Sequence, residues 1–203
     1  MTLDLLLAFV AFGFVTAVTP GPNNVMLLAS GVNFGFFRSV PHILGTAVGM
    51  VVMIASVGVG LGGLIQAYPV LYDVLRWVGA AYLLYLAWRI ARSGAPKAAS
   101  TGGRPLGFLG AAAFQWVNPK SWVMVVGAVT AYVPLDGYFR NLLLVAAVFG
   151  VVAAPSVGVW AAFGTALRRF LEAPGRVRAF NLAMALLLVL SLYPILTEGL
   201  GGG

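Results

Sequence analysis

The sequence predicts an all-α integral membrane protein. Three observations support this fold class: 61% of the 203 residues are hydrophobic, only 8% are charged, and the apolar residues gather in long runs. Soluble domains average about 25% charged residues, and about 20 apolar residues are needed for an α-helix to cross a bilayer. The chain is therefore expected to use its length for spans within a lipid bilayer.

Six apolar runs are long enough to be transmembrane helices, and short turn signals separate them. The first run begins with Asp4 instead of a basic stretch and no small-residue cleavage site follows it, so we interpret it as a retained helix and not a signal peptide. We expect the spans at about residues 5–30, 42–65, 73–90, 106–132, 141–167 and 179–197.

The chain is expected to form one membrane domain, 1–203, built from two halves. A small, polar stretch at 93–105 is interpreted as a cytoplasmic linker between the halves 1–92 and 106–203. Each half has three spans, and an odd number makes the second half enter the membrane in the opposite direction, as in inverted-repeat transporters. The first span of each half contains a proline at a similar depth, which favours inverted repeats over a chance likeness of two proline-containing helices.

The first span is interrupted by six residues that disfavour a helix. Its two prolines remove backbone donors and clash with carbonyls one turn earlier, so a straight helix is not expected here. Backbone groups freed inside hydrocarbon persist only where protein or a water-filled cavity satisfies them. A kink stabilised by helix packing is the alternative, but the clustered polar side chains favour a ligand site. The interruption consists of Thr19, Pro20, Gly21, Pro22, Asn23 and Asn24.

The fourth span is expected to be broken at Asn118, Pro119 and Lys120, and we predict that the two breaks meet in one substrate cavity. A lysine at the centre of a span costs about 2.5–3.5 kcal/mol, so Lys120 should have a partner or a task. We expect it to bind a substrate carboxylate together with helix N-terminal amides, and to carry a proton during transport. The alternative is a lysine that reaches the interface along its stem. Asn23, Asn24 and Asn118 are expected to orient the substrate.

The basic residues predict the orientation of the chain. When the loops are assigned alternately to the two sides, nine basic residues fall on one side, while only Arg76 and Arg140 fall on the other. The positive-inside rule makes the first side cytoplasmic, so both termini are expected outside. The nine residues are Arg38, Arg89, Arg92, Lys97, Arg104, Arg168, Arg169, Arg176 and Arg178.

Several other functions are disfavoured by the sequence. The chain has no cysteine and one histidine, and its spans contain no carboxylate pair or serine–base arrangement, so neither an enzyme, a metal site nor a cofactor is expected. Its basic residues are divided among short loops, which argues against nucleic-acid binding. His42 is interpreted as a solvated or capping residue, with a proton relay as the alternative. Gly45 and Gly49 are expected to allow close helix packing.

The motif Thr19-Pro20-Gly21-Pro22-Asn23 and the motif Asn118-Pro119-Lys120 together resemble the LysE/RhtB family of amino-acid exporters. The glycine-rich second span and residues 77–86 carry the same resemblance, which covers most of the chain. The family implies a small carrier in the inner membrane of prokaryotes that exports amino acids or close derivatives. Some members carry an acidic residue within a span, and this sequence has none there, which argues against cationic substrates.

The resulting hypothesis is a secondary exporter of small, neutral, zwitterionic amino acids that works by alternating access. A basic amino-acid exporter and a passive channel or structural membrane subunit are the alternatives. The expected partners are a small-molecule substrate and the lipid bilayer. The sequence leaves the oligomeric state open, and a homodimer is compatible with it.

Overall fold

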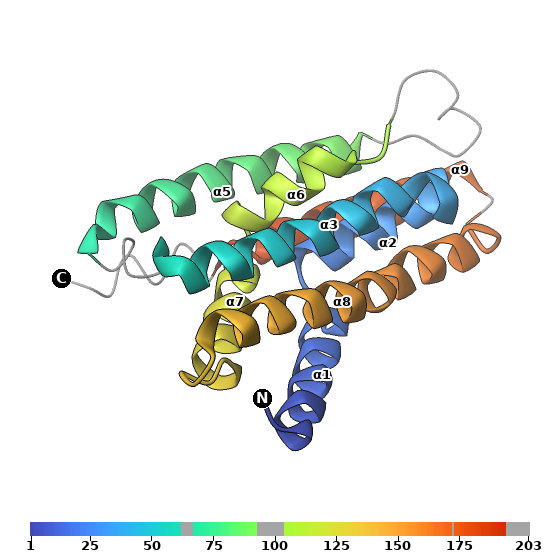
Figure 1. Ribbon diagram of the computed structural model, residues 1–203. Helices are drawn as coiled ribbons and strands as arrows, with labels where there is room; N and C mark the ends of the chain where they lie inside the picture. The colour runs from blue at the N-terminus through green and yellow to red at the C-terminus, as the bar shows by residue number, and fades with distance from the viewer. Residues whose placement is uncertain (62–66, 93–103, 172, 194–203) are drawn as a thin grey trace.

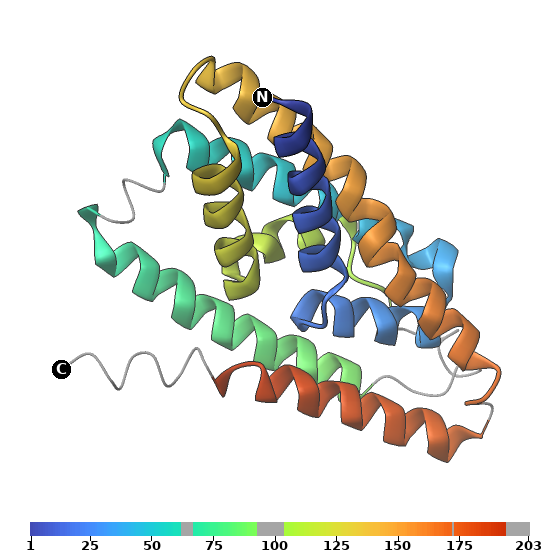
Figure 2. The same cartoon turned by 90° about the horizontal axis from the view of Figure 1, so that it is seen from below.

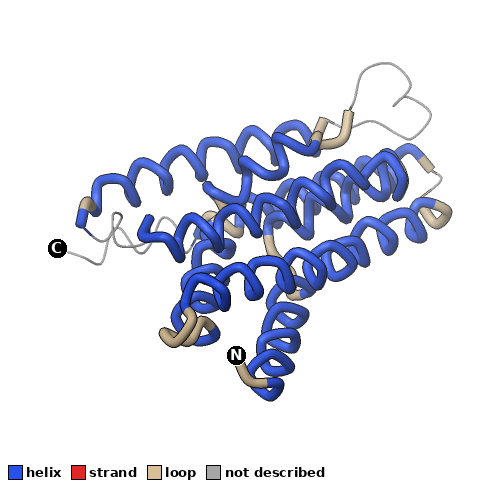
Figure 3. The backbone as a smooth tube through the Cα atoms, in the orientation of Figure 1, coloured by secondary structure: helices blue, strands red, loops and turns tan. Residues whose placement is uncertain are grey.

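The computed structural model describes residues 1–61, 67–92, 104–171 and 173–193. All regular elements in these residues are helices, as predicted, and the described residues form no strand (Figure 3). The linker predicted at 93–105 lies outside the described residues except for its last two positions. The elements are α1 (Leu3–Val18), α2 (Pro22–Phe34), α3 (Phe36–Ser56), the π-helix η1 (Val57–Leu61), α5 (Pro69–Ala91), α6 (Phe108–Val117), α7 (Pro119–Tyr132), α8 (Tyr138–Arg168) and α9 (Pro174–Leu190).

Two of these helices are long and apolar enough to cross a bilayer, namely Phe36–Gly60 and Tyr138–Arg168. The pair α1 and α2 passes the same test when it is counted as one bent span. The described residues therefore contain two or three spans by helix length, and the six-span arrangement stays a prediction. The second predicted span also begins earlier than expected, because α3 starts at Phe36, directly after the turn at Gly35.

Both predicted helix breaks are present. The first separates α1 from α2, whose axes differ by 60°, and the second separates α6 from α7 at Asn118. A proline stands at the first position of α2 and of α7, where its missing N–H costs no helical hydrogen bond. The prolines therefore end one helix and begin the next.

The broken helices run in opposite directions through the molecule. In Figure 1, α1 rises from the N-terminus to the middle and α2 continues toward the right, whereas α6 runs leftward and α7 then descends on the side of the N-terminus. Figure 2 shows α1 and α7 side by side. Their aromatic rings are in contact, because the Tyr132 ring centroid lies 5.3 Å from that of Phe9 and 5.1 Å from that of Phe12.

Close packing around α3 fixes the position of the second break. An added Cβ at Gly45 would lie 2.2 Å from the carbonyl oxygen of Phe108, and one at Gly49 would lie 2.7 Å from the Cα of Ala112. Only a glycine allows backbones to approach this closely, so the prediction for Gly45 and Gly49 is confirmed. Helix α8 packs along α2 and α3, and α5 packs along α9.

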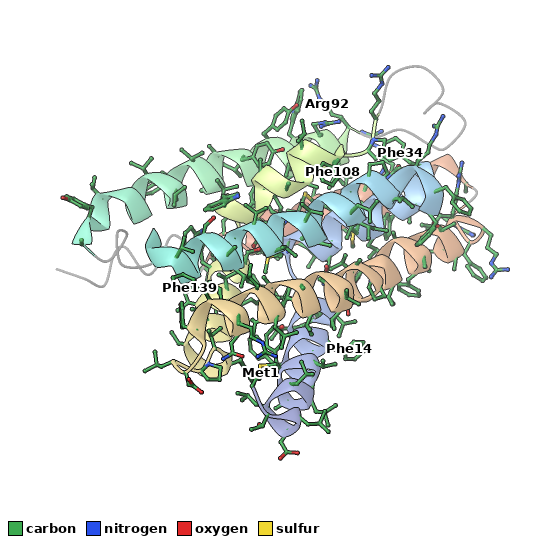
Figure 4. The ribbon with its side chains drawn as sticks, in the orientation of Figure 1. Met1, Phe14, Phe34, Arg92, Phe108 and Phe139 are labelled. Carbon is green, nitrogen blue, oxygen red and sulfur yellow. The ribbon has the colours of Figure 1, made fainter. Side chains whose placement is uncertain are left out.

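One end of the molecule is basic. The end of α2, the start of α3, the end of α5 and the loop from α8 to α9 all lie on the right in Figure 1, and Figure 4 shows Arg92 there. The loops that the charge pattern assigned to one side therefore share one end in the described part of the chain. We call this the basic end, and its described arginines are Arg38, Arg89, Arg92, Arg104, Arg168, Arg169, Arg176 and Arg178.

Candidate functional site

The two helix breaks border one cavity, which contains about 350 Å³ of empty space including its mouth. Side chains from both halves of the chain line it. The lining residues are Thr16, Ala17, Gly21, Asn23, Asn24, Thr46, Met50, Gln115, Asn118, Lys120, Ser121, Met124, Phe149, Ala153 and Val157.

Lys120 connects the second break to the first. Its Nζ donates to the carbonyl oxygen of Thr19 at 2.5 Å and to that of Pro20 at 3.4 Å. These carbonyls follow the end of α1, where a helix has unpaired acceptors and a partial negative charge. The stem of Lys120 passes close to Gly21, where an added Cβ would lie 2.8 Å from its Cδ. The half-buried ammonium therefore has a partner within the protein, as we expected from the free energy that a lysine within a span costs.

Two further side chains donate to carbonyls at the end of α1. Asn24 Nδ2 donates at 2.8 Å both to the carbonyl of Ala17 and to that of Thr19, and Trp160 Nε1 donates to the carbonyl of Val18 at 3.0 Å. Asn24 is buried. The Nδ2 group of Asn24 thus satisfies backbone carbonyls of the break and is not available to a ligand.

The second break is completed by residues close to it in sequence. Asn118 caps α7, because its Oδ1 accepts from the backbone N–H of Lys120 at 3.3 Å. Ser121 Oγ donates to Gln115 Oε1 at 2.9 Å across the break. Gln115, Asn118 and Ser121 are all buried, so their side chains form a polar part of the cavity lining that is held in place by hydrogen bonds.

Asn23 is the centre of a buried hydrogen-bond network. Its Oδ1 accepts from Thr46 Oγ1 at 3.0 Å and lies 3.2 Å from His42 Nε2 and 3.5 Å from Gln115 Nε2. The interpretation of His42 as a solvated or capping residue was wrong. The side chain is 1% exposed, because α3 begins six residues before it and its face packs against α2.

The predicted site residues fall into two groups. Gly21, Asn23, Asn24, Asn118 and Lys120 line the cavity, and their role in substrate binding stays a prediction.

The other four predicted residues shape the breaks without lining the cavity. Thr19 is exposed and its hydroxyl donates back to the carbonyl of Val15. Pro22 and Pro119 begin helices, and Pro20 lies exposed between α1 and α2.

The sequence prediction left out four polar residues that line the cavity, namely Thr16, Thr46, Gln115 and Ser121, and it gave no site role to His42, which contacts Asn23. Each stands as an isolated polar residue near or within an apolar run, a signal that could have identified them. The lining also includes apolar side chains, among them Met50, Met124 and Phe149. The described lining contains no acidic side chain, and no cluster suited to a metal ion occurs in the described residues.

Comparisons with known proteins give one consistent result. Residues 14–192 match the LysE type translocator family. The chain is 33% identical to the cysteine/O-acetylserine efflux protein of Escherichia coli (strain K12) and 34% identical to that of Salmonella typhimurium (strain LT2). Each alignment covers 93% of this chain and 96% of the relative. No solved structure matches the chain.

Proposed function

This chain belongs to the LysE type translocator family, and we propose that it exports small, neutral, zwitterionic amino acids across the inner membrane. It is a transporter and not an enzyme. Relatives named for the efflux of cysteine and O-acetylserine support substrates of this size and charge.

The observation that carries the proposal is the cavity shared by the two breaks. A zwitterion needs a cationic partner for its carboxylate, acceptors for its ammonium and space for its side chain. Lys120 and the free amides in the first turn of α2 suit the carboxylate. The amide oxygens of Asn23 and Gln115 suit the ammonium, and apolar lining residues such as Met50 suit a short apolar side chain.

The charge of the cavity supports neutral substrates over cationic ones. Lys120 is the charged side chain of the described lining. A lysine or arginine substrate would bring a second positive charge, and no carboxylate among the lining residues could balance it. The alternative of a basic amino-acid exporter is therefore less well supported than a carrier of neutral substrates.

We further propose six spans, arranged as inverted repeats that alternate in access around the cavity. The opposite directions of α1–α2 and α6–α7 support this arrangement, as does the position of both breaks in the middle of the molecule (Figure 1). Breaks of this kind in the first helix of each repeat are typical of secondary transporters. The cavity would then open to each side in turn as the two halves rock.

The basic end is proposed to face the cytoplasm, with both termini outside. Reporter fusions after Gly102 and after Gly203 test this orientation. We expect a cytoplasmic signal from the first and an external signal from the second. A cytoplasmic signal from the fusion after Gly203 would contradict the six-span arrangement.

Counterflow in liposomes tests the transport function. Purified protein should exchange labelled external cysteine, kept reduced, for unlabelled cysteine inside, and the exchange should saturate. A panel of amino acids added as competitors would then rank the substrates, with small neutral ones expected first and lysine and arginine last. Flux that does not saturate would favour a passive channel, and stronger competition by lysine would favour the basic-substrate alternative.

A further inference from the structure

A stripe of buried polar residues leads from the cavity toward the basic end along the interface of α2 and α3. Ser39, His42 and Thr46 are spaced three and four residues apart on α3, so they share one face. Asn23 and Ser30 are seven residues apart and face this stripe from α2. Ser30 Oγ lies 2.7 Å from Ser39 Oγ, and Ser39 donates to the carbonyl of Gly35 in the turn at the basic end.

The hydrogen bonds around Asn23 fix the protonation of His42. Gln115 Nε2 donates to the carbonyl of Ala111 at 2.9 Å, and Gln115 Oε1 accepts from Ser121, so the amide orientation of Gln115 is determined. The Asn23 atom that faces Gln115 Nε2 is therefore the acceptor Oδ1. His42 Nε2 faces the same oxygen, so this nitrogen carries the proton.

His42 Nδ1 consequently holds a free lone pair inside the protein. It is the one buried side-chain nitrogen or oxygen without a hydrogen-bond partner in the described part of the chain. A buried acceptor without a partner costs about 1–3 kcal/mol, and such atoms mark a functional role or a bound water. Imidazole is the side chain that most readily gains and loses a proton near neutral pH.

We propose that His42 is the proton site of this exporter, and that Asn23 Oδ1 couples its protonation to substrate binding. This inference rests on the proposed transport function. A proton bound at Nδ1 makes the ring an imidazolium, which strengthens the bond from Nε2 to Asn23 Oδ1. A substrate ammonium that displaces Gln115 Nε2, the longest of the three contacts, from the same oxygen repels the imidazolium. Proton and substrate therefore exclude one another, so one proton enters for each zwitterion that leaves.

Few titratable side chains lie on the elements that pack against α3. Helices α2 and α6, which pack on α3, contain no titratable side chain. Helix α8 carries Tyr138 and Arg140 at one end and Arg168 at the other, and Arg38 of α3 lies at the basic end.

Helix α7 contributes Tyr132 at its end and Lys120 at the cavity. Lys120 needs its own protons for the carbonyls of Thr19 and Pro20, and η1 contains no titratable residue. His42 is thus the group of this interface that is placed to exchange a proton.

The experiment compares wild-type protein with His42→Gln in liposomes, using labelled cysteine in two assays. Counterflow at equal pH tests transport alone, and accumulation driven by a pH gradient, with a trapped pH dye, tests proton coupling. Glutamine can still donate to Asn23 but does not titrate. We expect His42→Gln to retain counterflow and to lose both accumulation and the dye signal.

The outcomes are distinguishable. Absence of wild-type counterflow would refute the proposed function itself. Counterflow without any response of the wild type to the gradient, or wild-type accumulation by His42→Gln, would overturn the proton site while leaving the transport function intact.

A second measurement decides the question if His42→Gln is inactive in both assays. His42 is the single histidine of the chain, so labelled histidine in the wild-type protein, prepared without a histidine tag, gives one NMR signal. As the pH falls from about 8.5 to the lowest value at which the protein stays folded, we expect the Nε2-protonated tautomer to become an imidazolium, and added cysteine to oppose this change. A ring that stays neutral throughout, or whose titration ignores cysteine, would overturn the inference.

Discussion

The carbonyl groups freed at the α1–α2 break accept hydrogen bonds from three other helices, whereas those at the α6–α7 break are satisfied close by in sequence. At the first break the donors are Asn24 of α2, Lys120 of α7 and Trp160 of α8. At the second break Asn118 caps its own helix and Trp122 donates to the carbonyl of Trp116 at 2.8 Å. The first break is therefore a joint between the two halves, whereas the backbone of the second break is stabilised by hydrogen bonds within its own segment.

This difference indicates which break responds to substrate. A carboxylate in the cavity would compete with the carbonyls of Thr19 and Pro20 for the ammonium of Lys120. Binding would then loosen the connection between α1 and α7 while leaving the second break intact. We expect the α1–α2 joint to move during transport and the α6–α7 turn to act as a rigid support.

Removing the ammonium of Lys120 should have the largest effect. Lys120→Ala takes away the proposed carboxylate partner and two hydrogen bonds of the joint, so we expect transport to fall to background. Counterflow in liposomes and the amount of inserted protein are the measurements. Lys120→Arg, which keeps a cation, is the matched control and should retain part of the activity. Wild-type counterflow by Lys120→Ala would remove Lys120 from the site.

The two asparagines that complete the breaks provide the next test. Asn24→Ala leaves a buried carbonyl of α1 without its donor and should destabilise the protein by about 1–3 kcal/mol. Asn118→Ala removes only a helix cap and should cost about 0.5–2 kcal/mol. Thermal unfolding midpoints in one detergent measure both, with the exposed Thr130→Ala as a control. A larger loss from Asn118→Ala would reverse the comparison.

A smaller effect is expected from Gly21→Ala. The backbone φ of 178° suits any residue, so the added Cβ acts by displacing the Lys120 stem 2.8 Å away. A displacement that costs about 0.5–1.5 kcal/mol would raise the apparent KM for cysteine about two- to tenfold. Gly127→Ala, where a Cβ meets only the ring of Phe12 at 3.6 Å, should transport normally. Equal KM values for both variants would show that the contact with Lys120 is immaterial.

The helices and both breaks could be predicted from the sequence because apolar runs and prolines act locally. The sequence also indicated that Asn23 and Lys120 lie near one cavity. It could not show that Lys120 pairs with the end of α1, because that contact joins residues about one hundred positions apart. The burial of His42 was missed for a similar reason, since only the packing of α2 against α3 removes that face from solvent.

The central claim is that both breaks form one substrate cavity, and the absence of native cysteine makes a direct test available. Thr16→Cys places a thiol on the α1 side and Ser121→Cys on the α7 side. We expect O-acetylserine to slow the labelling of each thiol by a methanethiosulfonate reagent. The concentration of O-acetylserine that gives half of the maximal protection should be the same at both positions. Leu135→Cys serves as the control, because Leu135 is 89% exposed and does not line the cavity, so its labelling should be unaffected. Protection at only one of the two positions, or at neither in variants that still show counterflow, would contradict a shared site.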